Sequence, residues 1–117
     1  MIRNIALLLS TLLYVVSVHA EYGRTSPATP TLINTIRSEG FIVYGAFGNP
    51  GACTRINSIW IPRNHAEYDK LYSTALAAFM GGKKLDAFIH SCIDIPWLSG
   101  VTQTYNQLTV GDFRITH

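Results

Sequence analysis

The sequence has little charge. Only 14% of its 117 residues are Asp, Glu, Lys or Arg, and nine basic residues against seven acidic ones give a formal net charge of +2. Nucleic-acid binding depends on neutralising phosphates, and a membrane tether of the polybasic kind needs clustered Lys and Arg. The near balance of charges therefore argues against nucleic acid as a partner and against such a tether.

A catalytic constellation is also lacking. Ser91 adjoins His90, but neighbouring strand residues point to opposite faces, so the two do not form a triad. Asp86 and Asp94 share neither a motif nor a partner, and the glycines of "FGNPGA" have no Lys-Ser/Thr after them, which excludes a phosphate-binding loop. The histidines beyond residue 20 are scattered and lack a neighbouring nucleophile: His65, His90 and His117. We predict no enzymatic activity, no cofactor and no metal site.

Only one long hydrophobic run is present, at the N-terminus. Arg3 precedes fourteen apolar or small residues at 5–18, and the last of them, Val18, forms a small-x-small pattern with Ala20. A charged start, a short apolar run and a small-x-small exit are typical of a secretory signal peptide. An uncleaved anchor is the alternative. We predict a signal peptide over 1–20, a single domain over 21–117, no membrane span, and a secreted or periplasmic location.

Cysteine is scarce, with one residue at position 53 and one at 92. In an exported protein two cysteines most simply form one disulfide, here Cys53–Cys92. A zinc site with His90 or a reactive thiol are the alternatives, but "HSC" is not a metal-ligand spacing. A bridge would close a loop of about forty residues and stabilise the domain by about 3–4 kcal/mol.

Strand-like segments surround one helical segment. The segments 31–38, 41–48, 52–61, 83–93 and 108–116 are rich in β-branched, aromatic or alternating residues, and turn residues separate them. Residues 21–30 look like an extended arm and 94–107 like a loop. We expect Trp60 and Phe88 in the core. On the strand at 83–93 we expect one apolar face, formed by Leu85, Ala87, Ile89 and Ile93.

The helix is predicted over 65–80. Asn64 and Glu67 form a capping-box pattern, and glycines at 81–82 stop the helix. Its apolar residues recur at helical spacing: Tyr68, Leu71, Tyr72, Ala75, Leu76 and Phe79. The opposite face is small and weakly charged, which is unusual for a face that meets only water: Lys70, Ser73, Thr74, Ala77 and Met80.

The element order predicts a mainly β fold with one helix between strands 3 and 4. This is the order of the OB-fold, a five-stranded Greek-key barrel with a helix at one end. An open α+β sandwich made of the same elements is the alternative.

Several aromatic and amide side chains outside the predicted core suit a sugar, whose C–H side stacks on aromatic rings while its hydroxyls bond to polar groups. We predict Trp97, Tyr105 and Asn106 as glycan-binding residues, with a further contribution from the lead-in around Ser26.

The run from "SIWIP" through "EYDKLYSTALAAFMGGKKLDAFIH" resembles the binding (B) subunit family of pertussis-like bacterial toxins. That family has a strand ending in Ser-Ile-Trp-x-Pro, a helix closing on glycine, and a basic residue opening the next strand. The resemblance implies an OB-fold, a ring of five subunits, host-cell glycans as ligands and a possible catalytic A subunit. In that family an N-terminal serine helps to hold sialic acid, and Ser26 is the nearest candidate here.

Two functions therefore remain open. The first is a non-catalytic, glycan-binding toxin B subunit, in which the small helix face lies between subunits of a homopentamer or lines its pore. The second is a stand-alone exported OB-fold protein that binds a protein partner as an inhibitor or structural factor. Oligonucleotide binding by the same fold is a weaker third, because the net charge is near zero.

Overall fold

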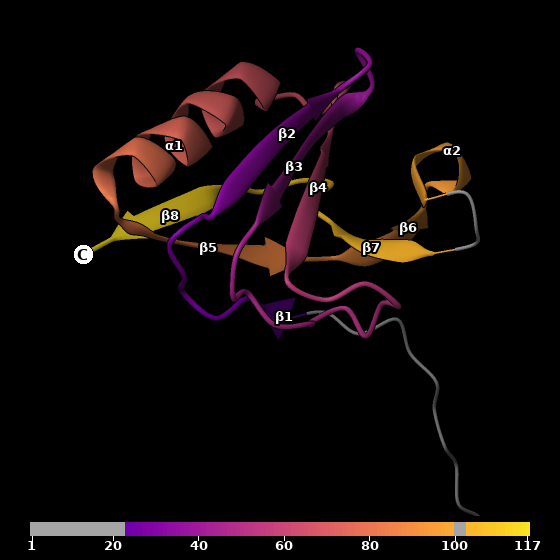
Figure 1. Cartoon of the computed structure of the whole chain (residues 1–117), viewed down its shortest axis with the longest axis horizontal. Coiled ribbons are helices and arrows are strands. Elements are labelled where there is room, and N and C mark those ends of the chain that lie inside the picture. The colour runs from indigo at the N-terminus through magenta and orange to yellow at the C-terminus, as the bar shows by residue number, and fades with distance from the viewer. Residues whose placement is uncertain (1–22, 100–102) are drawn as a thin grey trace, which may run out of the picture.

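The computed structural model describes residues 23–99 and 103–117, so the predicted signal peptide lies outside the described residues (Figure 1). The chain forms two sheets and one sizeable helix, which confirms a mainly β fold. The three-stranded sheet has the order β1 (Gly23–Arg24), β5 (Lys84–Ile89) and β8 (Phe113–Thr116). The five-stranded sheet has the order β2 (Leu32–Ile36), β3 (Gly40–Tyr44), β4 (Ser58–Pro62), β7 (Thr104–Gln107) and β6 (Ser91–Asp94). The helices are α1 (Tyr68–Gly81) and the short α2 (Pro96–Ser99).

Both sheets are open, so the closed barrel that the sequence predicts is not seen. The pairing is antiparallel except between β4 and β7, which run parallel. One residue, His90, separates β5 from β6, so a single run of chain passes from one sheet to the other. In Figure 1, α1 lies beside β2 and β8, whereas α2 lies beyond β6 on the other side of the molecule.

The N-terminal lead-in is part of the three-stranded sheet, not the extended arm predicted from its prolines. The Thr25 N–H donates to the Ala87 carbonyl at 2.8 Å, and the Thr25 hydroxyl accepts from the Ala87 N–H at 3.0 Å. Ala28 and Leu85 exchange two backbone hydrogen bonds of 3.1 and 2.8 Å. Because residues 23–24 form a strand of their own, the helix follows the fourth strand of the chain.

The strand predicted at 52–61 begins only at Ser58. The Asn49 side chain accepts from the Cys53 N–H at 2.9 Å and donates to the Cys53 carbonyl at 2.7 Å. Ala52 and Asn57 have positive φ angles of 56° and 62°. Asn side chains that bond to nearby backbone compete with strand pairing. The segment therefore folds as a turn, which the alternating pattern did not reveal.

The disulfide Cys53–Cys92 is present, with the two Cα atoms 5.6 Å apart. It links the turn before β4 to β6, the edge strand of the five-stranded sheet. The prediction of this pairing is confirmed, although Cys53 lies in a turn and not on a strand.

Strands β3 and β4 of the five-stranded sheet are buried on both faces, and a hydrophobic cluster lies on each face. The helix-side core lies between this sheet, α1 and the inner face of the three-stranded sheet. It includes Phe41, Val43, Ile59, Ile61, Leu71, Ala75, Leu85, Ala87 and Ile89. The tryptophan-side core lies on the opposite face of the sheet and comprises Ile36, Ile42, Trp60, Ile95 and Tyr105.

Trp60 is buried as predicted, but the prediction for Phe88 is wrong, because its side chain is 37% exposed. Leu85, Ala87 and Ile89 point into the helix-side core, so the alternation of β5 turns Phe88 outward. The face predicted from Leu85, Ala87 and Ile89 is confirmed, whereas Ile93 is only half-buried.

Helix α1 begins later than predicted, at Tyr68. Glu67 is the N-cap residue without a side-chain cap, and its N–H donates to His65 Nδ1 at 2.9 Å, so the capping box predicted from Asn64 does not form. Gly82 ends the helix with a φ of 65°, a left-handed angle that favours glycine.

The fully buried stripe of α1 consists of Leu71, Ala75 and Ala78, and Tyr68 and Tyr72 pack against the same core as predicted. Leu76 and Phe79, which the periodicity placed in the core, are each 39% exposed. The stripe is narrower than predicted because small alanines bring the helix close to the sheet and leave the larger side chains at the edge.

The region 94–107, predicted as a loop, contains α2 and strand β7. The predicted closing strand at 108–116 is shorter and starts at Phe113. Strand β7 pairs with β4 on one side and with β6 on the other, and its Tyr105 side chain is buried.

Candidate functional site

Helix α2 positions Trp97 at the edge of the tryptophan-side core. Pro96 is its first residue, a position at which proline is favoured because that N–H has no helical partner. The Trp97 ring meets the Trp60 ring edge-on, with centroids 6.3 Å apart, and the Arg37 guanidinium lies 4.8 Å from the Trp97 ring centre. Trp97 is 38% exposed and Trp60 only 4%. Trp97 is therefore an aromatic surface held in place by a buried one.

The turn between β2 and β3 forms a second wall. Arg37 and Ser38 both have positive φ angles, 56° and 96°. The Glu39 N–H donates to the Ile36 carbonyl at 2.9 Å, and the Arg63 N–H donates to the Glu39 carbonyl at 2.8 Å. This second bond joins the turn to the residue that follows β4.

Glycine is required beside that turn. A Cβ added at Gly40 would lie 2.3 Å from the Ile61 carbonyl oxygen and 2.8 Å from the Trp60 ring. The close approach fixes the turn against Trp60.

Between these walls is a cleft of about 290 Å³, called here the Trp97 cleft. It is lined by Glu39, Trp60, Pro62, Arg63, Asn64, Ile93, Asp94, Ile95 and Trp97. Its size is at the lower end of ligand pockets, and it combines apolar walls with an amide, two carboxylates and a guanidinium. It can receive one small ring that carries several hydroxyls.

The predicted glycan-binding residues do not meet. Ser26 is exposed, and its N–H donates to the Phe47 carbonyl at 3.1 Å, beyond the Tyr44 end of β3. The Trp97 cleft lies at the other end of β3, next to the turn that contains Glu39. Ser26 and Trp97 thus belong to opposite ends of the five-stranded sheet.

Tyr105 and Asn106 are each only 1% exposed. Tyr105 packs in the tryptophan-side core. The Asn106 side chain accepts from the Gly51 N–H at 2.8 Å and donates to Asn49 Oδ1 at 3.0 Å, so it supports the turn near the disulfide. Both side chains serve the fold, and they form no surface with Trp97.

Sequence reasoning missed most polar residues of the cleft. The sequence places Glu39 among the turn residues between two strands, predicts Asn64 as a helix cap, and leaves Asp94 as an isolated acid. The turn "IRSEG" and the segment "IPRN" lie far apart in the sequence, and only the pairing of β3 with β4 brings their ends together. A sharp turn with charged residues before a glycine was the available signal.

No family model, curated protein or solved structure matches the chain. Within residues 23–99 and 103–117, no group of His, Cys, Asp and Glu could hold a metal ion, and no helix is both long and apolar enough to cross a membrane.

The predicted assembly face of α1 is accessible. Lys70, Ser73, Ala77 and Met80 are exposed and Thr74 is half-buried. Lys70 forms an ion pair with Glu67 at 3.0 Å, in which both side chains are exposed. Beside these residues lie the partly exposed side chains of Leu76 and Phe79, so this side of the helix is more apolar than the sequence predicts.

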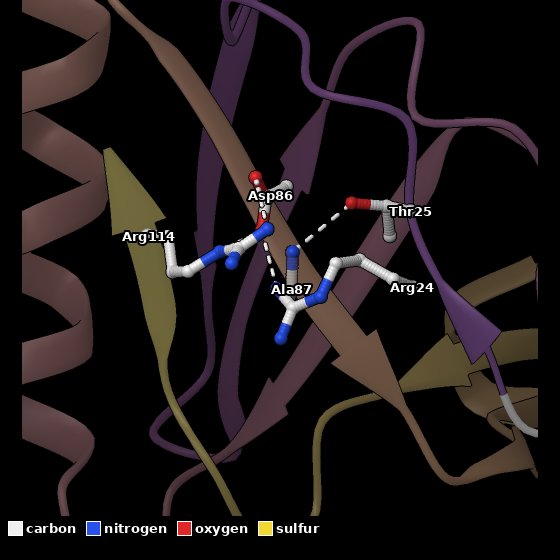
Figure 2. Close-up of polar contacts among 5 residues, drawn as sticks. All are labelled: Arg24, Thr25, Asp86, Ala87 and Arg114. Atoms are coloured by element: carbon white, nitrogen blue, oxygen red, sulfur yellow. Dashed lines mark hydrogen bonds and ion pairs between the residues drawn. The ribbon is translucent and has the colours of Figure 1, made fainter. Parts of the chain in front are cut away.

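Asp86 has partners that the sequence did not reveal (Figure 2). Its carboxylate is buried and accepts hydrogen bonds from Arg24 of β1 and from Arg114 of β8, with Arg114 Nε at 2.9 Å. Burial alone would raise the pKa of Asp86. The hydrogen bonds and charges of Arg114 and Arg24 outweigh that effect and hold its pKa below the ordinary value.

Proposed function

We propose that the protein is a secreted, non-catalytic, glycan-binding B subunit of a bacterial toxin, which forms a pentameric ring and binds sugar in the Trp97 cleft. The observation that carries the proposal is the cleft itself, where a half-exposed tryptophan faces a guanidinium, two carboxylates and an amide. An aromatic face suits the C–H side of a sugar ring, and the polar groups suit its hydroxyls.

The pairing pattern supports an OB-like interpretation of the fold. If β1 and β2, β5 and β6, and β7 and β8 are each one interrupted strand, the order of the five strands becomes 1-2-3-5-4-1. The three interrupted strands then run from one sheet into the other, and the parallel β4–β7 pair and the β1–β5 pair supply the 3–5 and 4–1 contacts of one interrupted barrel. Counted in this way, the helix lies between strands 3 and 4.

The Cys53–Cys92 disulfide is compatible with an oxidising location outside the cytoplasm, as the proposed export requires. Exposed strand edges and an apolar helix side are features that subunit contacts would cover. Strand β8 ends one sheet and β2 ends the other, and α1 contacts both strands. Met80 is 76% exposed on the same helix. A ring would bury these groups, which otherwise favour aggregation.

A glycan array tests the proposed ligand class, with two matched arginine variants. Arg63 and Arg55 are both exposed, and each lies over a tyrosine ring, at 5.2 and 5.6 Å from its centre. Only Arg63 lines the cleft. We expect Arg63→Gln to lose binding to the glycans that the wild type captures, while Arg55→Gln retains it. Absence of any captured glycan, or equal losses in both variants, would count against the cleft.

Light scattering tests the ring. We expect a particle of about five chain masses for the wild type and a smaller one for Ala77→Glu, because like charges would meet around the ring. Ala46→Glu, at an exposed alanine outside α1, is the control and should leave the particle unchanged.

A wild-type monomer at micromolar concentration would favour the alternative, a stand-alone exported protein. In that case the exposed Leu76, Phe79 and Met80 would form the contact surface for a protein partner.

A further inference from the structure

The outer face of the three-stranded sheet carries a second group of side chains with binding chemistry. Leu85, Ala87 and Ile89 point inward, so Asp86 and Phe88 lie on the outer face of β5. The strand register places Arg114 of β8 opposite Asp86, and Arg24 of β1 opposite Phe88. Figure 2 shows the two arginine side chains reaching the Asp86 carboxylate from either side of β5.

Asp86 fixes the orientation of both guanidinium groups. The carboxylate is 2% exposed, whereas the side chains of Arg24 and Arg114 are 36% and 58% exposed. The bonds to Asp86 engage one Nη of Arg24, together with Nε and Nη2 of Arg114. Each guanidinium has five N–H donors in a fixed plane. The donors that do not bond to Asp86 have no acceptor among the described residues. These donors are pre-oriented on a solvent-exposed face.

The cluster has an excess of positive charge. Two guanidiniums share one buried carboxylate, which leaves one positive charge uncompensated within the cluster. Asp112, exposed in the turn before β8, also acts on the charge of Arg114, but through solvent. An anion at the outward side of the two guanidiniums would neutralise the excess.

An aromatic ring adjoins the cationic groups. Phe88 is 37% exposed, its ring centre lies 6.0 Å from the Arg24 guanidinium carbon, and the His90 ring is 5.1 Å away. A sheet face that simply met water would have little reason to leave a phenylalanine exposed. The ring offers a surface for the apolar side of a ligand whose anionic group meets the arginines.

We propose that Arg24, Arg114 and Phe88 form a binding site for a sulfate or phosphate monoester carried on a sugar ring. Two guanidinium forks from different strands present more donors than the two oxygens of a carboxylate can accept, whereas a monoester has three terminal oxygens. This site is separate from the Trp97 cleft, and neither site needs the other.

Titration of the full-length processed protein with four small sugars, followed by NMR chemical shifts, tests the ligand class. The probes are glucose 6-sulfate, glucose 6-phosphate, glucuronate and glucose. From the shifts of Arg24, Phe88 and Arg114 we expect saturable binding of at least one ester at this site, binding of glucuronate weaker by about tenfold, and none of glucose. Whichever ester binds more tightly identifies the source of the anion. Failure of both esters to saturate, or glucuronate binding as tightly, would overturn the proposal.

Variants separate a built site from general charge attraction. Arg114→Lys and Arg24→Lys keep the charge but lose the planar fork, and each should weaken ester binding by about tenfold. Lys84→Gln is the control, because Lys84 lies on the same outer face of β5 but takes no part in the pairing with Asp86. It should weaken binding by less than about threefold. Equal losses in Lys84→Gln and Arg114→Lys would contradict the site.

Two further variants should not weaken ester binding: one should strengthen it and the other should leave it unchanged. Asp112→Asn removes the exposed carboxylate near Arg114 and should strengthen ester binding by about twofold. Trp97→Ala should leave ester binding unchanged, so failure of the cleft and failure of this site can be told apart. Thermal unfolding of each variant identifies any loss of binding that is caused by misfolding.

Discussion

The two hydrophobic cores on either side of the five-stranded sheet differ in composition and in closure. The helix-side core is mostly aliphatic, and α1 and the three-stranded sheet cover it, so that Leu85, Ala87 and Ile89 have no exposed surface. The tryptophan-side core is smaller and contains Trp60 and Tyr105. The short α2 covers part of it through Leu98, and its rim is open at Trp97.

This difference suggests separate roles for the two cores, one in the stability of the domain and the other in ligand binding. Burial of aliphatic side chains in a closed core contributes most of the free energy of folding, whereas an open aromatic rim can exchange water for a ligand. We infer that the helix-side core holds the domain together and that the tryptophan-side core positions the cleft.

The largest effect is expected from the disulfide, which ties β6 to the rest of the molecule. The double variant Cys53→Ala/Cys92→Ala should lower the free energy of unfolding by about 4 kcal/mol, because the bridge closes a loop of about forty residues. Chemical denaturation measures the loss. Because Ile95 alone separates β6 from α2, hydrogen exchange in this variant should rise first in β6 and α2. Equal acceleration throughout the helix-side core would contradict the difference between the cores.

A matched pair of truncations compares the cores directly. Leu85→Ala, in the closed core, should cost about 3 kcal/mol of unfolding free energy, within the range for buried leucines. Ile95→Ala should cost less, about 2 kcal/mol, because Ile95 borders the Trp97 cleft and the site can relax or admit water. Denaturant midpoints at constant m-value give both numbers. A larger loss for Ile95→Ala would reverse the assignment of stability to the helix-side core.

A smaller effect is expected from acid. The pKa of Asp86 is lower in the folded chain than its ordinary value of 3.8, so ionised Asp86 stabilises the fold fully above pH 4. That contribution is lost as the pH falls through the folded-state pKa. Asp86→Asn should therefore be less stable than the wild type at neutral pH, and the gap should narrow below about pH 4. Denaturation at a series of pH values measures the gap, and a gap independent of pH would show that the ion cluster is not its source.

The sequence predicted what local pattern and pairwise chemistry determine. The disulfide followed from two cysteines, the helix from its periodicity and terminal glycines, and the inward face of β5 from alternation. The sequence-based prediction failed where backbone hydrogen bonding decides the structure. The examples are the turn formed by Asn49 and the side chain of Phe88, which the strand register turns outward. Four of the cleft residues come from turns and strand ends that meet only through the pairing of β3 with β4.

Tyr105 and Asn106 show the same limit for the candidate site. Their residue types suit a sugar, and in the sequence they lie close to Trp97. Strand β7 is an interior strand of its sheet, between β4 and β6, and both side chains are enclosed. Composition indicates which chemistry is available, but the topology decides which side chains reach the surface.

Tryptophan fluorescence tests the central claim, that the Trp97 cleft binds sugar. The chain has two tryptophans, and only Trp97 is substantially exposed. We would titrate the wild type and Trp97→Phe with sialyllactose, lactose and N-acetyllactosamine. Trp97→Phe retains a ring at the rim and should change the unfolding free energy by less than about 1 kcal/mol. At least one sugar should shift the wild-type emission saturably, and the shift should be much smaller in Trp97→Phe, because the remaining Trp60 is only 4% exposed. No saturable shift with any of the three, or the same shift in Trp97→Phe, would contradict sugar binding at this cleft.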